Sequence, residues 1–198
     1  MPNTALKKYL FFHIFKNNNG FTLLELLVVF SVIGLLTGIG FASFVSYSKK
    51  QAFDQAAIDI KNGIDQARAN ATSRVKPTPC TGALDRYRFI TCANASGETN
   101  LCTDPTDLYQ TDAVCYVAST NSGYYTVYTK KRPSNLIVSV ANGECGSNRI
   151  LRFYIIANGS DTDSCRIVLT TTDSSMSKTI CVDNGGNVNI KEGTVTCT

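Results

Sequence analysis

The sequence predicts an α+β protein in which a long N-terminal helix packs on a C-terminal antiparallel β-sheet domain with disulfides. An almost wholly apolar run occupies residues 21–45, and an amphipathic helical stripe follows it over 46–73. Short β-rich runs between turn signals fill the remainder, together with all eight cysteines. We therefore expect one helix over 21–76 and a globular domain over 77–198.

The apolar run, Phe21 to Val45, has the length of a membrane span. Its 25 residues contain one charge, Glu25. At about 1.5 Å per residue, a helix of this length crosses a hydrocarbon core of about 30 Å. Three lysines precede the run and place its N-terminal end in the cytoplasm by the positive-inside rule: Lys7, Lys8 and Lys16. Lys49 and Lys50 follow the apolar run at its C-terminal end, where the positive-inside rule does not favour basic residues.

Glu25 needs a physical explanation, because a carboxylate within a membrane helix costs about 2.5–3.5 kcal/mol on insertion scales. One interpretation is an interfacial acid at a helix N-terminus, where the macrodipole favours negative charge. The other is that cleavage after Gly20 makes Phe21 a new N-terminus, whose α-amine pairs with Glu25 of a neighbouring subunit. The combination of a small residue before the apolar run with an acid five residues later favours the second interpretation.

The segment KNNNGFTLLELLVV, residues 16–29, closely resembles the prepilin leader and cleavage site of type IV pilins and type II secretion pseudopilins. The resemblance implies a leader peptide at 1–20, cleavage after Gly20, N-methylation of Phe21 and a role of Glu25 in filament assembly. The family often has a proline where this chain has Ala42, so any loosening of the helix would come from its glycines: Gly34, Gly38 and Gly40.

The same resemblance implies partners and a location. The partners are other pilin subunits in a homo- or hetero-oligomeric filament, the prepilin peptidase, the inner-membrane assembly platform and membrane lipid before assembly. The chain would cross the bacterial inner membrane once and then enter an extracytoplasmic filament or the cell surface. Gly34 and Gly38 form a small-xxx-small pair that lets helices approach closely, although glycine is common in membrane helices in any case.

The helix should continue beyond the apolar run as a one-sided helix. Apolar residues recur there at steps of three or four: Phe53, Ala56, Ala57, Ile60, Ile64, Ala67 and Ala71. Pro77 and Pro79 mark its end. We expect this stripe to dock on the apolar face of the sheet, which buries both surfaces.

Eight cysteines indicate an oxidising compartment. They contain no Cys-x-x-Cys pair, and an even, dispersed set is typical of disulfides rather than zinc ligands. Buried free thiols are the alternative. Eight cysteines allow 105 pairings, and the sequence does not choose among them. The candidates are Cys80, Cys92, Cys102, Cys115, Cys145, Cys165, Cys181 and Cys197.

Nine β-rich runs follow the helix. They are Arg86–Thr91, Ala113–Ser119, Tyr124–Thr129, Leu136–Ala141, Arg149–Ile156, Arg166–Thr171, Thr179–Asp183, Asn187–Lys191 and a last run near Val195. Hairpin turns are expected at Thr120–Gly123 and Asn184–Gly186, because Asn and Gly accept positive φ. Residues 92–112 are expected to form a long loop held by Cys92 and Cys102.

Three classes of function come into question: a structural filament subunit, a minor pilin that binds DNA or a surface ligand, and an anchored enzyme. The one histidine, His13, falls in the expected leader, so the mature chain has no histidine for a Ser-His or Cys-His pair. We expect no enzyme activity, no cofactor and no metal. The structural subunit is the favoured class.

The DNA-binding alternative depends on two weaker signals. Residues 152–190 resemble the end of the GspH/FimT-like class of minor pilins, some of which take up DNA through a basic C-terminal motif. Here the tail is KEGTVTCT, with one Lys and one Glu, which argues against DNA capture by that route. Aromatic and basic residues also interleave over Tyr124–Arg132, which suits contact with bases and phosphates. The alternative interpretation of that run is a hairpin with a solvated basic end.

Overall fold

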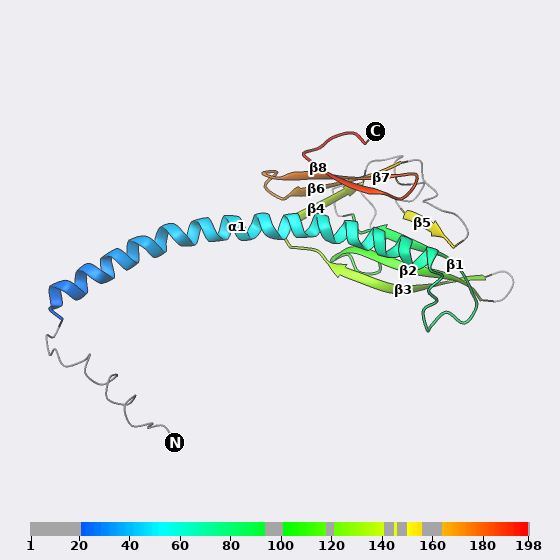
Figure 1. The fold of residues 1–198 in the computed structure, drawn as a ribbon, viewed down its shortest axis with the longest axis horizontal. Helices are drawn as coiled ribbons and strands as arrows, with labels where there is room; N and C mark the ends of the chain where they lie inside the picture. The colour runs from blue at the N-terminus through cyan, green and yellow to red at the C-terminus, as the bar shows by residue number, and fades with distance from the viewer. Residues whose placement is uncertain are drawn as a thin grey trace, which may run out of the picture. The chain divides into compact units, whose positions relative to one another are not determined.

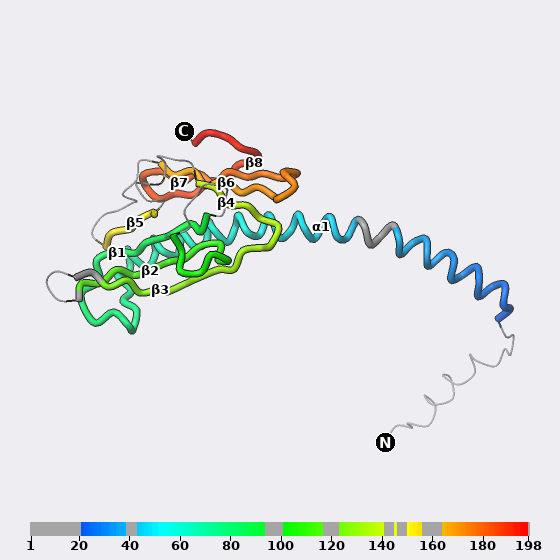
Figure 2. The backbone as a smooth tube through the Cα atoms, turned by 180° about the vertical axis from the view of Figure 1, so that it is seen from behind, coloured from blue at the N-terminus to red at the C-terminus, as the bar shows by residue number. Residues whose placement is uncertain are grey.

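The computed structural model describes residues 21–93, 101–117, 121–140, 145, 150–155 and 164–197. It contains one helix, α1 (Leu23–Thr72), and eight strands (Figures 1 and 2). The strands are β1 (Ala83–Thr91), β2 (Asp107–Val117), β3 (Asn121–Lys131), β4 (Leu136–Val140), β5 (Ile150–Tyr154), β6 (Ser164–Thr171), β7 (Ser177–Asp183) and β8 (Val188–Glu192). The chain divides into two compact units, Met1–Ser48 and Lys49–Thr198.

The second unit holds two four-stranded sheets and the C-terminal part of α1. One sheet has the order β3-β2-β1-β5 and the other has the order β4-β6-β7-β8. Every strand pair in both sheets is antiparallel. This arrangement confirms the predicted fold class of one long N-terminal helix packed against antiparallel sheets with disulfides.

The helical stripe forms the centre of the core. All seven of its apolar residues are at most 3% exposed. They share one cluster with the inward side chains of both sheets, among them Tyr87 and Phe89 of β1 and Ile167 and Leu169 of β6. Figures 1 and 2 show this part of α1 running alongside both sheets. The predicted docking of the stripe on a sheet is confirmed, and both sheets take part.

Gly63 allows α1 to approach the first sheet closely. A Cβ at this position would lie 2.7 Å from Cζ of Tyr109 and 2.8 Å from Cε2 of Phe89. Both rings are buried, and their centroids are 5.0 Å apart. A glycine inside a helix lowers helix stability by about 1 kcal/mol relative to alanine. Glycine is present here because the packing against these two rings leaves no room for a side chain.

We therefore expect Gly63→Ala to destabilise the protein by about 1–2 kcal/mol. Overpacking costs about 1–3 kcal/mol, and the better helix propensity of alanine offsets about 1 kcal/mol of it. The measurement is urea unfolding of the full chain in detergent, followed by the near-ultraviolet circular dichroism of its tyrosines. In a Tyr109→Leu background the same substitution should cost less. Equal costs in the two backgrounds would contradict the steric explanation.

Most strands lie where the sequence predicts them, with three differences. β2 begins at Asp107, so residues 107–112 are strand and not part of the expected loop. Asn121–Gly123 belong to β3 and not to a turn. The run near Val195 is not a strand, although the Val195 amide donates to the Thr179 hydroxyl at 3.1 Å.

Residues 107–112, which were expected to be loop, form the first half of β2 and contain several buried polar side chains. Asp107, Gln110, Thr111 and Asp112 are all at most 5% exposed. The Gln110 amide donates to the Asp112 carboxylate at 2.7 Å and to the Thr126 hydroxyl at 3.1 Å. These side-chain hydrogen bonds pair polar groups inside the domain, and a hydrophobic pattern does not reveal them.

The β7–β8 hairpin confirms the predicted Asn184–Gly186 turn. Gly186 has φ +75°, and its amide donates to the Asp183 carbonyl at 2.8 Å. The eight cysteines form four disulfides: Cys80–Cys115, Cys92–Cys102, Cys145–Cys165 and Cys181–Cys197. The structure thus confirms the disulfide interpretation of the cysteines and supplies the pairing.

Candidate functional site

The first turn of α1 begins with a side-chain cap. The Thr22 hydroxyl accepts the Glu25 amide at 3.2 Å, and the Thr22 carbonyl accepts the Leu26 amide at 3.1 Å. Thr22 is therefore the N-cap and Glu25 the third helical residue, which is the spacing of a capping box. Thr22 was not among the predicted site residues, although the pattern Thr-x-x-Glu before an apolar run is a usable signal.

Glu25 carries the one acidic charge in this turn. Its side chain is exposed, and none of the ion pairs among the described residues involves it. A carboxylate here is favoured by the positive end of the helix dipole. The helix dipole and the cap thus favour the Glu25 carboxylate at this position. Because it forms no ion pair within the described chain, it can pair with a group from another molecule. Gly20 lies outside the described residues.

The side chains that follow form an apolar column. Within residues 21–48 every described side chain is exposed, from Phe21 at 73% and Leu23 at 83% to Phe44 at 68%. α1 is long and apolar enough to cross a membrane, and its most apolar window has no buried residue. An exposed apolar surface of this extent marks contact with a membrane or with other protein.

Two hydroxyl groups in the apolar segment, those of Ser31 and Thr37, donate hydrogen bonds to carbonyls of their own helix. Ser31 donates to the Val28 carbonyl at 2.7 Å, and Thr37 donates to the Ile33 carbonyl at 2.7 Å. An unsatisfied polar group in hydrocarbon costs several kcal/mol. These internal bonds let the segment enter an apolar medium without that cost.

Gly34 and Gly38 have open space around them. A Cβ at either position would meet no atom of the chain within 4 Å. No close contact within the described chain therefore requires these glycines. Their role in packing against another helix stays a prediction.

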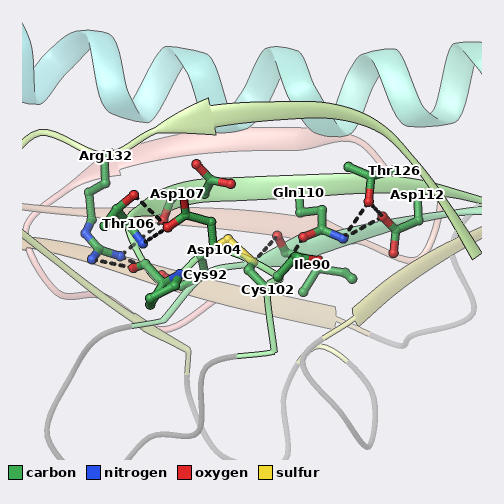
Figure 3. The surroundings of a disulfide bond; sticks show 12 residues. Ile90, Cys92, Cys102, Asp104, Thr106, Asp107, Gln110, Asp112, Thr126 and Arg132 are labelled. Carbon is green, nitrogen blue, oxygen red and sulfur yellow. Dashed lines mark hydrogen bonds between the residues drawn. A yellow bond between two sulfur atoms is a disulfide. The ribbon is translucent and has the colours of Figure 1, made fainter.

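The basic residues of β3 and its C-terminal flank already have partners in the globular unit. Lys130 pairs with Asp59 of α1 at 3.1 Å, and Lys131 pairs with Asp104 and Asp107 at 2.5 and 2.8 Å. Arg132 donates to three backbone carbonyls beside the Cys92–Cys102 disulfide (Figure 3). DNA contact by this run stays a prediction, and it would require these side chains to exchange their partners.

Asp104 pairs with Lys131 and has a lowered pKa. The Lys131 ammonium and the Thr106 hydroxyl and amide bond to Asp104 and hold its pKa below the ordinary value of 3.8. A lowered folded-state pKa stabilises the fold above the unfolded-state value, and that stability is lost as the pH falls through the folded-state value. The pKa values of Asp173 and Asp183 are lowered in the same way by neighbouring hydrogen bonds.

We expect the urea midpoint of the full chain to fall with pH below about pH 4, where these carboxylates take up protons in the unfolded chain while the folded chain keeps them ionised. Asp104→Asn should make that fall shallower, because one of the three carboxylates no longer titrates. The same unfolding assay, repeated from neutral to acid pH, measures both profiles. Parallel profiles for the two proteins would show that Asp104 does not contribute.

The geometry defines a class of protein: a disulfide-bonded β-domain that follows a long helix, whose apolar N-terminal segment has exposed side chains at every described position. Residues 15–41 match the family model described as the prokaryotic N-terminal methylation motif. The chain therefore carries the signature of type IV pilins and pseudopilins. The match covers the N-terminal segment alone. Neither a curated protein nor a solved structure matches the chain.

The motif has direct implications for the precursor. It supports a type IV pilin-like or pseudopilin subunit, and it implies other pilin subunits and a prepilin peptidase as partners. Together with the apolar helix, it fits a precursor anchored in the inner membrane. The GspH/FimT-like subtype stays a prediction.

Proposed function

We propose that this protein is a structural subunit that is cleaved after Gly20, methylated at Phe21 and assembled through α1 into a type IV pilus or a type II secretion pseudopilus. One observation carries the proposal: the methylation motif leads directly into an apolar helical segment whose described side chains are all exposed. Such a surface is stable in lipid before assembly and among identical helices afterwards. The expected location is the inner membrane, with a cytoplasmic N-terminus, and then an extracytoplasmic filament.

Glu25 guides assembly in this proposal. Cleavage after Gly20 would place a new α-amine four residues before Glu25, and this carboxylate has no ion-pair partner among the described residues. In apolar surroundings an isolated charge is costly and a close pair of opposite charges is far less so. A subunit that joins the filament therefore gains most where its Glu25 meets the Phe21 amine of a neighbour.

Gly34 and Gly38 support the same step. Their open surroundings leave room for a second helix to approach the backbone of α1. In this proposal each part of the chain has a separate role, and the domain boundaries are those expected from the sequence. Residues 1–20 are the leader, 21–76 are the assembly segment that contains α1 and has its apolar part at 21–45, and 77–198 are the globular domain.

The test is intact mass and N-terminal sequencing of the protein from native membranes. We expect a chain that begins at N-methylated Phe21 and is eight hydrogens lighter than the reduced chain, because four disulfides are formed. A Gly20→Val variant is the control, and it should keep its first twenty residues. Native protein that keeps its first twenty residues would contradict the proposal.

A further inference from the structure

Two lysines follow the apolar segment of α1 and have no ion-pair partner among the residues that the structure describes. Lys49 and Lys50 are exposed and form none of the ion pairs found there. Four other lysines of the globular unit do pair with acids: Lys61, Lys130, Lys131 and Lys178. Tyr47 lies one turn before Lys50 on the same helix and is 67% exposed.

The position of these residues along α1 matches the membrane–water interface. The apolar run of 25 residues has a helical length of about 37 Å, which exceeds a hydrocarbon core of about 30 Å. The turn that follows it therefore reaches the headgroup layer on the side opposite to the leader. Tyrosine is enriched at that depth, and lysine side chains extend from it toward the phosphates.

We propose that Lys49 and Lys50, with Tyr47, bind the phosphates of phospholipid headgroups and fix how deeply α1 sits in the membrane before assembly. This inference rests on the proposed function, because it needs the apolar segment to span a membrane. It also explains why two cations follow the span on the side where the positive-inside rule disfavours them.

Acids of a neighbouring copy are poorer partners for these lysines. Between residues 21 and 50 the one acid is Glu25, which lies 24 residues before Lys49, or about 36 Å away along the helix. The next acids along α1 are Asp54 and Asp59, and they pair with Lys178 at 2.8 Å and with Lys130 at 3.1 Å. Among parallel copies at one depth, lipid phosphate is the abundant anion at this level.

The experiment uses the absence of tryptophan from the chain. Phe44, which is 68% exposed, is replaced as Phe44→Trp, and the introduced indole is then the one fluorophore of its kind. The full chain is placed in vesicles of phosphatidylethanolamine and phosphatidylglycerol at a low protein-to-lipid ratio. Quenching by lipids brominated at successive depths then locates the introduced indole.

Neutralising both lysines, as Lys49→Gln with Lys50→Gln, should let the introduced indole move deeper by about 3–5 Å, up to one helical turn. In vesicles of phosphatidylcholine alone the difference between the two proteins should shrink, because the surface carries no net negative charge. Arg74→Gln with Lys76→Gln removes two exposed charges elsewhere and should leave the depth unchanged.

Each other outcome has a distinct meaning. Equal depth with and without the lysines would overturn the lipid-phosphate proposal and leave the membrane span intact. A depth difference that appears only at high protein density would assign the lysines to a neighbouring chain and also overturn it. An introduced indole that no brominated lipid quenches would contradict the membrane span itself, and with it the proposed function.

Discussion

Replacing Glu25 by alanine is expected to reduce incorporation into filaments by roughly a hundredfold and to leave cleavage after Gly20 intact. The variant removes the carboxylate that would neutralise the Phe21 amine of a neighbouring subunit. An isolated charge in a membrane helix costs about 2.5–3.5 kcal/mol, and about 1.4 kcal/mol corresponds to a factor of ten. The measurement is the ratio of subunit in sheared filaments to subunit left in the membrane.

Two further variants separate the charge from the helix cap. Thr22→Ala removes the hydroxyl that accepts the Glu25 amide and keeps the carboxylate. It should cost the helix about 1 kcal/mol and leave assembly nearly normal. Glu25→Asp keeps the charge one methylene shorter and should assemble partially. Normal incorporation of Glu25→Ala would rule out charge pairing as the basis of assembly.

The sequence was most informative where one physical pattern dominates. The membrane segment and the stripe from Phe53 to Ala71 follow from hydrophobicity and period, and the structure places every stripe residue in the core. The N-terminal motif could also be identified from the sequence, because Gly20, Phe21 and Glu25 lie within six consecutive positions. Local signals of this kind do not depend on how the rest of the chain folds.

Features that depend on contacts between distant residues were missed. Nothing near Gly63 in the sequence shows that Tyr109 will lie against it. Arg132 is one basic residue in a run of three, yet its guanidinium bonds to the carbonyls of Cys92, Pro105 and Asp107 and so joins the two ends of the connection between β1 and β2 (Figure 3). Such roles follow from strand register, which a single sequence does not specify.

The disulfide pairing shows the same limit. Cys80 follows the end of α1, and Cys115 lies on β2, where strand register sets Leu84 opposite it. The β1–β2 pairing thus brings the segment after the helix close to Cys115, and the cystine links them across 35 residues of sequence. A sequence with eight dispersed cysteines allows this pair among many others.

Removing the Cys80–Cys115 bridge, as Cys80→Ala with Cys115→Ala, is expected to lower the free energy of unfolding by about 4 kcal/mol. In the chain-entropy model the cost grows with the loop that the bridge closes, which is 35 residues here. Both cysteines are at most 3% exposed, so the alanines add no exposed polar group. Urea unfolding of the full chain in detergent, with the other three bridges oxidised, measures the loss.

The Cys92–Cys102 bridge is the matched control, because it closes a loop of 10 residues in the connection between β1 and β2. Its removal should cost about 3 kcal/mol, about 1 kcal/mol less than removal of the longer bridge. The bond from the Tyr87 hydroxyl to the Val75 carbonyl at 2.7 Å also ties the segment after the helix to β1, and neither variant substitutes a residue that forms it. The order of the two losses therefore tests loop closure itself. An equal or larger loss for the short bridge would show that local packing around the disulfide loop, where Arg132 binds, outweighs the entropy of the unfolded chain.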